Sequence, residues 1–328
     1  MKRRNRRTIV RWILRFLPVF LLTGCVTLVV LFLFQTSRWD GKSRFTLVLN
    51  SRPLLVLSIE PETKRSVLVA FPANTQLSLP YGYGTYVASS VYPLGNLDKK
   101  RGGGMLLSRS IEETLGVPVY GFFSLEEQVE ISLTTVSDTA KLKRDYFSYI
   151  GVIPRLPSFI QSLSGSQTNI SIIDLFRLWQ AIRSFRSDTV IFIDAQKEGL
   201  LWEEKLPDGI NVFTIDTDSF GNRYPDIFQD HEVRLEEKSV EVVNATEVES
   251  VAKRFGWVLE TMGADVLVKS TSMIPDTTSC VIHVRVKEIW DSAIVQRLMR
   301  YYGCKKGEIS LSTNVVDLQV VLGVGFTQ

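Results

Sequence analysis

Lys99, Lys100 and Arg101 form the only run of three consecutive basic residues after the N-terminal arm of this 328-residue chain. They directly precede Gly102–Gly104 and a segment with helical spacing. Backbone amides and the positive dipole end at the start of a helix favour phosphate. No Gly-Lys-Ser or Gly-Lys-Thr follows, so a P-loop is not indicated. The alternative is a solvated basic turn with a flexible glycine hinge.

Four tyrosines lie just before this basic turn, in a Gly-rich stretch (81–95) that is predicted to be a loop. Tyrosine rings stack on sugars and line apolar grooves, which makes Tyr83 and Tyr86 candidate ligand contacts. Tyr81 and Tyr92 complete the cluster. Core packing beside a surface turn is the alternative interpretation.

The net charge of +3 is unevenly distributed. Seven basic residues precede Phe16, and no acidic residue occurs before Asp40. Without those seven, 31 basic residues stand against 35 acidic ones, a net of −4. A slightly acidic body argues against nucleic acid as a partner, because phosphate contacts need positive charge.

An uncharged run of 19 residues (16–34) follows the basic arm. As a helix at about 1.5 Å per residue, it nearly spans a hydrocarbon core of about 30 Å. The basic residues before it predict a cytoplasmic tail (1–15), a single span of the cell membrane (16–35) and an extracytoplasmic remainder. A cleaved signal peptide is the alternative, although the run is long for one and no small-residue cleavage site closes it.

The three cysteines leave alternatives open. Cys25 ends a stretch that resembles a lipobox, so it is either a lipidated first residue or a buried thiol in a membrane helix. Cys280 and Cys304 are either a disulfide, which needs their Cα atoms within about 7 Å, or two core thiols. His231 and His283 stand far apart in the chain. A zinc site or a Ser-His-Asp triad is therefore poorly supported, and no metal ligand or catalytic residue is predicted.

Apolar runs alternate with amphipathic stretches beyond residue 43, which predicts an α/β class with a mixed sheet. Strands are expected at 45–50, 54–59, 66–71, 76–80, 117–125, 189–194 and 210–216. One helix (105–116) is expected to bury Met105, Leu106, Ser110 and Leu115. Another (171–185) is expected to bury Ile172, Leu175, Leu178, Trp179 and Ile182.

A second unit begins near Glu237 and is predicted to be a small two-layer α/β domain. Its strands are expected at 239–243, 265–269, 279–287 and 318–322, and its helices at 247–262 and 290–302. Asn244 and Thr246 are expected to cap the first of these helices, and Val248 to face inward.

Two stretches resemble the LytR-CpsA-Psr family of bacterial cell-envelope proteins. The first is LLVLSIEPETKRSVLVAFPANTQLSLPYGYGTYVASSVYPLG, followed by GGGMLLSRSIEETLGVPVYGFFSLE. The second is VEVVNAT with the closing DLQVVLGVGF, which is similar to the C-terminal domain often attached to such proteins. The matches extend over residues 45–326 and are weak between 126 and 166. They imply an α/β sandwich domain (44–230) and a LytR-type C-terminal domain (237–328).

The family is associated with magnesium-dependent transfer of a glycopolymer from a polyprenyl-pyrophosphate carrier to peptidoglycan. Arginine forks suit a pyrophosphate, and carboxylates hold the metal ion. In this sequence Ala73 and Asn74 replace the family's Arg-Asp pair, and Arg52 stands where a carboxylate is expected.

A later family segment dense in Arg and Asp has no counterpart. Arg183, Arg186 and Asp188 imitate it, but at the end of a helix, and are interpreted as solvated surface.

These departures predict a membrane-anchored, extracytoplasmic protein that binds polyprenyl-linked or glycan ligands without turning them over. The candidate ligand contacts are Arg52, Asn74, Tyr83, Tyr86, Lys99, Lys100 and Arg101. Lipid binding would require a long apolar cavity between the sheet and the helices of the first domain. The alternative is an active glycopolymer phosphotransferase that uses substituted residues such as Asp98 and Lys100. Magnesium is expected only in that case. The protein partner of the C-terminal domain is not indicated.

Overall fold

The computed structural model describes residues 36–124, 167–185, 189–207, 209–309 and 315–327, together with Phe20, Thr23, Gly24, Thr27 and Leu28. The predicted tail and most of the predicted span, Cys25 included, lie outside the described residues. Within the described part of the chain, no helix combines the length and apolar character needed to cross a bilayer.

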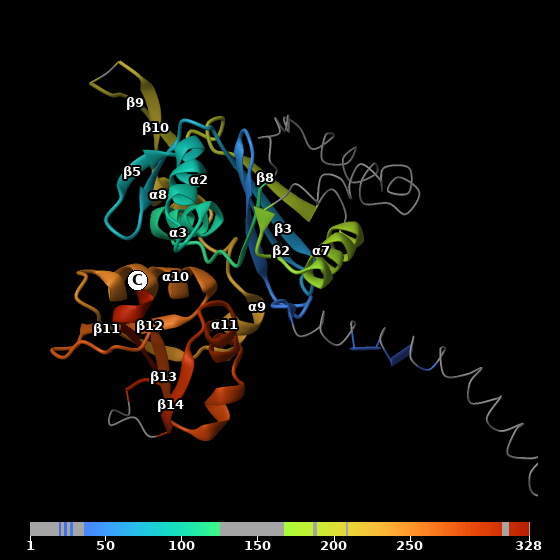
Figure 1. Cartoon of the computed structure of the whole chain (residues 1–328), viewed down its shortest axis with the longest axis vertical. Coiled ribbons are helices and arrows are strands. Elements are labelled where there is room, and N and C mark those ends of the chain that lie inside the picture. The colour runs from blue at the N-terminus through green and yellow to red at the C-terminus, as the bar shows by residue number, and fades with distance from the viewer. Residues whose placement is uncertain are drawn as a thin grey trace, which may run out of the picture.

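A six-stranded mixed sheet forms the centre of the first unit, in the order β7-β6-β1-β2-β3-β8 (Figure 1). β2 pairs antiparallel with both β1 and β3, while β6 and β8 run parallel to β1 and β3. The mixed sheet predicted from the sequence is thereby confirmed. Its strands are β1 (Phe45–Asn50), β2 (Leu54–Glu60), β3 (Arg65–Phe71), β6 (Gly121–Ser124), β7 (Gln167–Thr168) and β8 (Val190–Asp194).

Helices cover both faces of this sheet: α2 (Ala88–Leu97) and α3 (Gly103–Leu115) on one, α7 (Ile172–Ser184) on the other (Figure 1). On the α2–α3 face, Leu106, Leu107 and Ile111 are at most 1% exposed and pack against the sheet. On this face of the sheet, these side chains fill the space between the strands and the helices. On the α7 face, Leu49, Leu57 and Phe123 remain partly exposed.

α2 lies in the stretch that was predicted to be a loop. Tertiary contacts explain the error: the backbone N–H groups of Ala88 and Ser89 donate to the carbonyls of Thr75 and Ala73. These contacts supply partners for the first turn despite the Gly and Pro content of the segment. Two predicted buried positions are also wrong, since Met105 is 47% and Ile172 71% exposed. The expected strand at 117–125 is shorter, because β6 begins at Gly121.

Smaller elements complete this part of the chain. β4 (Gln76–Leu79) pairs with β5 (Gly84–Val87), and β9 (Leu201–Lys205) pairs with β10 (Asn211–Ile215). Two short helices lead onward, α8 (Thr217–Arg223) and α9 (His231–Glu236). The strand β9 and the helices α8 and α9 were not predicted.

The second unit contains a five-stranded mixed sheet in the order β12-β11-β15-β13-β14. α10 (Val251–Met262) and α11 (Ala293–Tyr301) accompany it, with 3-10 turns at Lys287–Asp291 and Val324–Phe326. Its strands are β11 (Ser239–Ala245), β12 (Asp265–Thr271), β13 (Cys280–Val284), β14 (Lys305–Ile309) and β15 (Leu318–Gly323). β14 was not predicted, and the domain boundaries themselves stay predictions.

The expected helix cap at Asn244 and Thr246 is wrong. α10 begins only at Val251, with Ser250 at its N-cap position, and Val248 is exposed. The Asn244 and Thr246 side chains instead hold the turn after β11: the Thr246 amide and hydroxyl both donate to Asn244 Oδ1, and Asn244 Nδ2 donates to the Val248 carbonyl. Short polar side chains compete for local backbone groups in this way.

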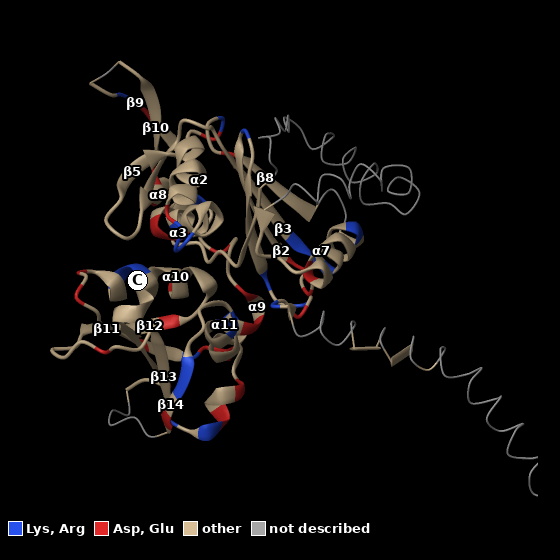
Figure 2. Ribbon diagram, in the orientation of Figure 1, with Lys and Arg blue, Asp and Glu red and all other residues tan. Residues whose placement is uncertain are grey.

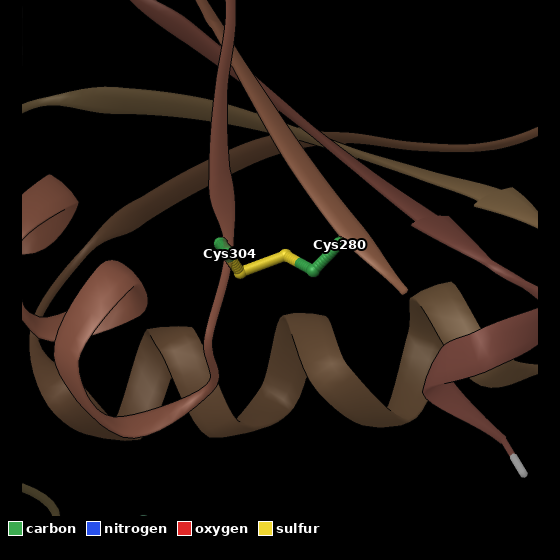
Figure 3. The surroundings of a disulfide bond; sticks show 2 residues. All are labelled: Cys280 and Cys304. Carbon is green, nitrogen blue, oxygen red and sulfur yellow. A yellow bond between two sulfur atoms is a disulfide. The ribbon is translucent and has the colours of Figure 1, made fainter. Parts of the chain in front are cut away.

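Cys280 and Cys304 form a disulfide, with their Cα atoms 4.5 Å apart (Figure 3). The bond joins the start of β13 to the residue before β14 and lies against α10 (Figure 3). Of the two alternatives left open by the sequence, the paired one is therefore present.

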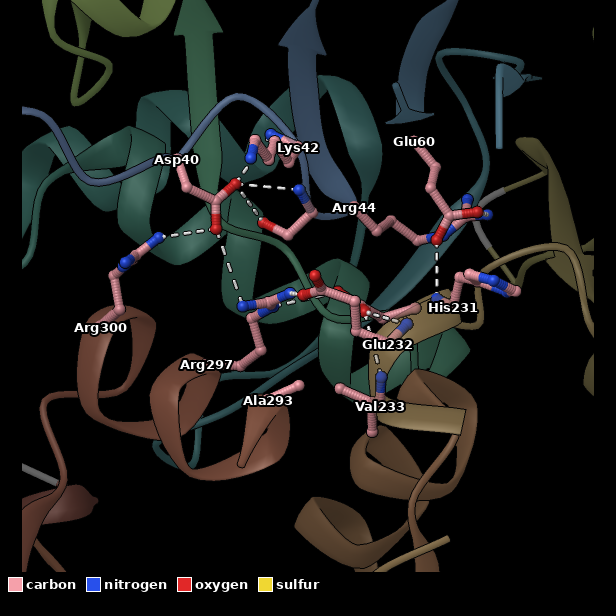
Figure 4. Close-up of polar contacts among 12 residues, drawn as sticks. Asp40, Lys42, Arg44, Glu60, His231, Glu232, Val233, Ala293, Arg297 and Arg300 are labelled. Atoms are coloured by element: carbon pink, nitrogen blue, oxygen red, sulfur yellow. Dashed lines mark hydrogen bonds and ion pairs between the residues drawn. The ribbon is translucent and has the colours of Figure 1, made fainter. Parts of the chain in front are cut away.

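Ion pairs join the second unit to the first, and the pair between Arg297 and Asp230 is buried (Figure 4). Arg297 of α11 pairs with Asp230 at 3.0 Å and with Glu232 at the start of α9. It also lies 3.7 Å from Asp40, which precedes β1, and Arg300 pairs with the same carboxylate at 3.0 Å. The apolar core is continuous as well, because Tyr120 stacks on Tyr301 with ring centroids 3.8 Å apart.

Candidate functional site

Arg52 and Asn74 lie at one end of the six-stranded sheet. Arg52 is exposed in the turn between β1 and β2, and Asn74 follows the end of β3, which pairs with the start of β2. Asn74 Nδ2 donates to the Asn211 carbonyl at 3.0 Å, and the Asn74 carbonyl accepts from Phe213 N–H at 3.1 Å. Asn74 thus fastens β10 to the loop after β3.

Tyr83, Lys100 and Arg101 come together around Asp98 in the turn between α2 and α3. Asp98 Oδ2 accepts from the Arg101 guanidinium at 2.8 Å and from the Tyr83 hydroxyl at 3.1 Å. Asp98 Oδ1 accepts from Lys100 N–H at 3.0 Å. The Arg101 hydrogen bond, followed by that of the Lys100 amide, holds the pKa of Asp98 below its ordinary value. This carboxylate is therefore engaged in ordering the basic turn.

The other candidates are less closely involved in this cluster. The side chains of Lys99 and Lys100 are exposed beside it, while Arg101 lies 4.0 Å above the Tyr81 ring. Tyr86 is 40% exposed on β5, and Tyr92 is buried with its hydroxyl donating to Gln167 at 2.7 Å. The four tyrosines accordingly divide between a surface turn and the core.

The glycine triplet serves close packing more than anion binding. Gly103 N–H donates to Asn96 Oδ1 at 3.0 Å, so one of the amides expected to face a phosphate has a partner within the protein. A Cβ at Gly103 would lie 2.4 Å from the Tyr92 carbonyl, and one at Gly104 would lie 2.1 Å from the Phe122 ring. Only glycine lets α3 approach α2 and β6 this closely.

The basic turn opens onto a groove of about 930 Å³ between α3 and the second unit. The first unit contributes the tip of the β4–β5 hairpin, the basic turn and the exposed face of α3. The second contributes α10 and the C-terminal segment. The lining residues are Leu79, Pro80, Tyr81, Gly82, Gly84, Lys100, Arg101, Met105, Arg109, Glu112, Glu113, Val248, Val251, Arg254, Phe255, Val258, Ser279, Tyr302, Gly325, Phe326 and Thr327.

The polar side of the groove carries four basic residues against two carboxylates, a net charge of +2. Arg109 pairs with Glu112 and lies 5.0 Å from the centre of the Tyr302 ring. The Tyr302 hydroxyl donates to Glu112 at 3.0 Å, and Arg254 pairs with Glu113 at 3.0 Å. Both contacts join α3 to the second unit, so the groove exists only when the two units are together.

Burial shapes the titration of these groups. It raises the pKa of Tyr302, and the adjacent Glu112 carboxylate raises it further, so Tyr302 remains a neutral donor. For Arg109, burial acts to lower the pKa, but the charge of Glu112 outweighs it and the pKa rises above its ordinary value. Burial also raises the pKa of Glu113, against the opposing charge of Arg254. Arg109 is thus a permanent cation of the groove.

Sequence reasoning missed Arg109, Arg254 and Tyr302. Arg109 stands three residues before Glu112 in a predicted helix, a spacing that indicates an ion pair but not a ligand site. Arg254 and Tyr302 belong to the other unit, and no local pattern indicates which surface of the first unit they approach.

No three His, Cys, Asp or Glu side chains gather to hold a metal ion in the part of the chain that the structure describes. Arg183 lies at the end of α7, whereas Arg186 and Asp188 lie outside the described residues.

Comparison with known proteins gives matches among solved structures alone. No family model matches the chain, and no curated protein matches its sequence. Bacillus subtilis TagT matches with 16% identity and a TM-score of 0.38, over 58% of this chain and 91% of that one. Bacillus subtilis TagV matches with 13% identity and a TM-score of 0.39, over 56% of this chain and 95% of that one.

A further match is a structure described as the LytR-CPS2A-Psr family protein YwtF (TagT) with bound octaprenyl pyrophosphate. It shares 15% identity and a TM-score of 0.38, over 58% of this chain and 92% of that one. The family named in the description of this last structure is the one that the sequence motifs resemble.

Proposed function

We propose that this chain is a membrane-anchored, extracytoplasmic cell-envelope protein of the LytR-CpsA-Psr type that binds a pyrophosphate-bearing polyprenyl or glycan ligand. The ligand's anionic headgroup occupies the groove between α3 and the second unit. The protein holds this ligand and does not transfer it. The proposed anchor is the apolar run at 16–35.

The groove carries this proposal because its lining is amphiphilic. Lys100, Arg101, Arg109 and Arg254 supply positive charge, while Met105, Phe255 and Phe326 supply an apolar wall in the same space. Its volume of about 930 Å³ lies within the range of ligand pockets and suits a headgroup with its first isoprene units. Guanidinium forks suit phosphate oxygens, and Arg101 and Arg109 lie over the Tyr81 and Tyr302 rings, which helps to position them at the groove.

Ala73 and Asn74, which replace the family's Arg-Asp pair, favour ligand binding without transfer of the ligand. Ala73 carries no charge, and the Asn74 amide is bonded to the backbone of Asn211. Asp98, the carboxylate closest to the basic turn, already accepts three hydrogen bonds. A proton acceptor for phosphoryl transfer needs a free lone pair directed at the nucleophile, whereas both oxygens of Asp98 accept hydrogen bonds from the turn itself.

Titration calorimetry of the full-length chain with farnesyl pyrophosphate tests this function. Lys100→Ala should weaken binding roughly 10-fold, because a charge-assisted phosphate contact contributes about 1.5–3 kcal/mol at full strength and Lys100 is solvent-exposed. Lys99→Ala is the matched control: this side chain is also exposed but does not line the groove. Equal weakening by both variants would point to a diffuse charge effect and contradict the site.

Measurement of phosphate release distinguishes a protein that only binds the ligand from one that transfers it. We expect no release when the same chain is incubated with a polyprenyl pyrophosphate and magnesium. Magnesium-dependent release that Lys100→Ala abolishes would establish the alternative, an active phosphotransferase with substituted residues.

A further inference from the structure

α7 carries an outer stripe, exposed at Ile172 and Phe176 and partly exposed at Trp179 and Arg183, whose composition suits a membrane surface. Ile172, Phe176, Trp179 and Arg183 follow one another at intervals of four, three and four residues, which places them on one side of the helix. Ile172 is 71% and Phe176 60% exposed. The helix packs on the core through other residues, Leu178 and Ala181. We name these four residues the α7 outer stripe.

Contacts within the stripe order its aromatic rings. The rings of Phe176 and Trp179 stack with their centroids 6.1 Å apart, and the Arg183 guanidinium lies 5.9 Å from the Trp179 ring centre. The stripe therefore runs from an aliphatic residue through two aromatic rings to a cation. Tryptophan and arginine are the residues that settle at the boundary between acyl chains and headgroups.

The chain segment that leads to the proposed anchor is fastened to the first turns of α7. Asp174 accepts from the Ser37 hydroxyl at 2.6 Å and from Arg38 N–H at 2.9 Å. Arg177 donates to the Ser37 hydroxyl at 2.6 Å. Ser37 is two residues beyond the predicted span, and two extended residues reach at most roughly 7 Å. The start of α7 is thereby confined to the immediate neighbourhood of the membrane.

The charges around this segment agree with such a position. Arg38 and Lys42 are exposed, whereas the nearby carboxylates are engaged: Asp174 with the segment itself, and Asp40 with Arg300 and Arg297. Figure 1 shows α7 beside the segment that leads into β1 (36–44). The β9–β10 hairpin lies at the opposite end of the first unit. Figure 2 shows basic positions on and near α7.

We infer that the α7 outer stripe lies on the bilayer surface and, together with the anchor, fixes the orientation of the extracytoplasmic part. The bound partner is the lipid surface itself, with the rings among the acyl chains nearest the headgroups and Arg183 at the phosphates. This inference rests on the anchor in the proposed function but not on the ligand groove.

Quenching of tryptophan fluorescence by brominated lipid tests the inference on the full-length chain. The protein is reconstituted in phosphatidylcholine vesicles brominated close to the headgroup, and its emission is compared with that in unbrominated vesicles. Trp179→Phe should remove part of the quenching. Trp202→Phe is the matched control, because Trp202 is 65% exposed on the distant hairpin, and its replacement should leave the quenching unchanged.

A second variant provides an independent check in case Trp179→Phe fails to fold. Alkaline extraction of the chain from the vesicles distinguishes failure of the proposed anchor from failure of the α7 outer stripe. Phe176→Asp should reduce the quenching in the same direction, by lifting the stripe from the lipid. If the chain resists alkaline extraction but Trp179→Phe leaves the quenching unchanged, the stripe is not on the bilayer and the anchor stands. If the chain is extracted from the vesicles, the anchor fails and the inference fails with it.

Discussion

Arg297 is a fully charged side chain that is only 3% exposed. Its guanidinium is placed among three carboxylates from two segments: Asp40 before β1, and Asp230 and Glu232 at the start of α9 (Figure 4). Asp230 is itself 1% exposed, and its other carboxylate oxygen accepts from the first amides of α9. Partners on every side offset the cost of removing these charges from water.

Replacing Arg297 should therefore cost more than replacing its exposed neighbour. Arg297→Met leaves Asp230 buried without its cation, which is expected to lower the free energy of unfolding by about 3–5 kcal/mol. Arg300→Met removes a partly exposed partner of Asp40 and should cost below about 1 kcal/mol. Urea denaturation of both variants measures the difference. Similar losses from the two would show that Arg297 is not the charge that holds the units together.

Asp40 should make the same junction sensitive to acid. Burial acts to raise the pKa of Asp40, but hydrogen bonds from the Lys42 and Ser43 amides and the charge of Arg297 outweigh it, so the pKa lies below its ordinary 3.8. A carboxyl with a lowered folded-state pKa contributes stability above its unfolded pKa and loses it as the pH falls through the folded value.

The free energy of unfolding should accordingly fall between about pH 5 and pH 2, and less steeply in Asp40→Asn. Denaturation curves measured between about pH 5 and pH 2 give the slope of the unfolding free energy against pH for each protein. An unchanged slope in the variant would exclude Asp40 as a source of the acid sensitivity.

At the scale of elements, α3 shows what sequence patterns predict and what they leave out. Its apolar spacing and the stop at Gly116 predicted its extent well, since the structure places it at Gly103–Leu115. The pattern did not explain the glycines at its start, because their role depends on Phe122 and Tyr92 from other elements. α2 was missed for the same reason: its first turn is satisfied by the loop before β4.

Gly104→Ala should destabilise the protein, although alanine is normally the better helix former. The added Cβ meets the Phe122 ring at 2.1 Å, and overpacking of this kind costs about 1–3 kcal/mol. Gly221→Ala in α8 is the matched control, because nothing lies within 4 Å of its Cβ position. That change should be neutral or stabilise by roughly 0.5 kcal/mol. Thermal unfolding of both variants measures this difference in stability. A Gly104→Ala protein as stable as the parent would contradict the prediction.

For the whole molecule, the candidate site depends on how the two units meet. The sequence indicated the basic turn at Lys99–Arg101, and the structure places Lys100 and Arg101 on the groove. Arg52 and Asn74 lie elsewhere, at the end of the sheet. The candidates taken from the family resemblance are therefore not in the same site as the candidates taken from the basic run. The remaining cations come from α3 and α10, which local patterns cannot bring together.

The most direct test of the account is whether the second unit contributes to ligand binding. Farnesyl pyrophosphate is titrated into the full-length chain and into Arg254→Ala, which should bind roughly 10-fold more weakly through loss of a phosphate-facing charge. Arg285→Ala is the matched control: like Arg254, Arg285 is a half-exposed arginine of the second unit paired with a carboxylate, but it does not line the groove. Its affinity should equal that of the parent. Unchanged affinity in Arg254→Ala would place the ligand outside the groove and contradict the account.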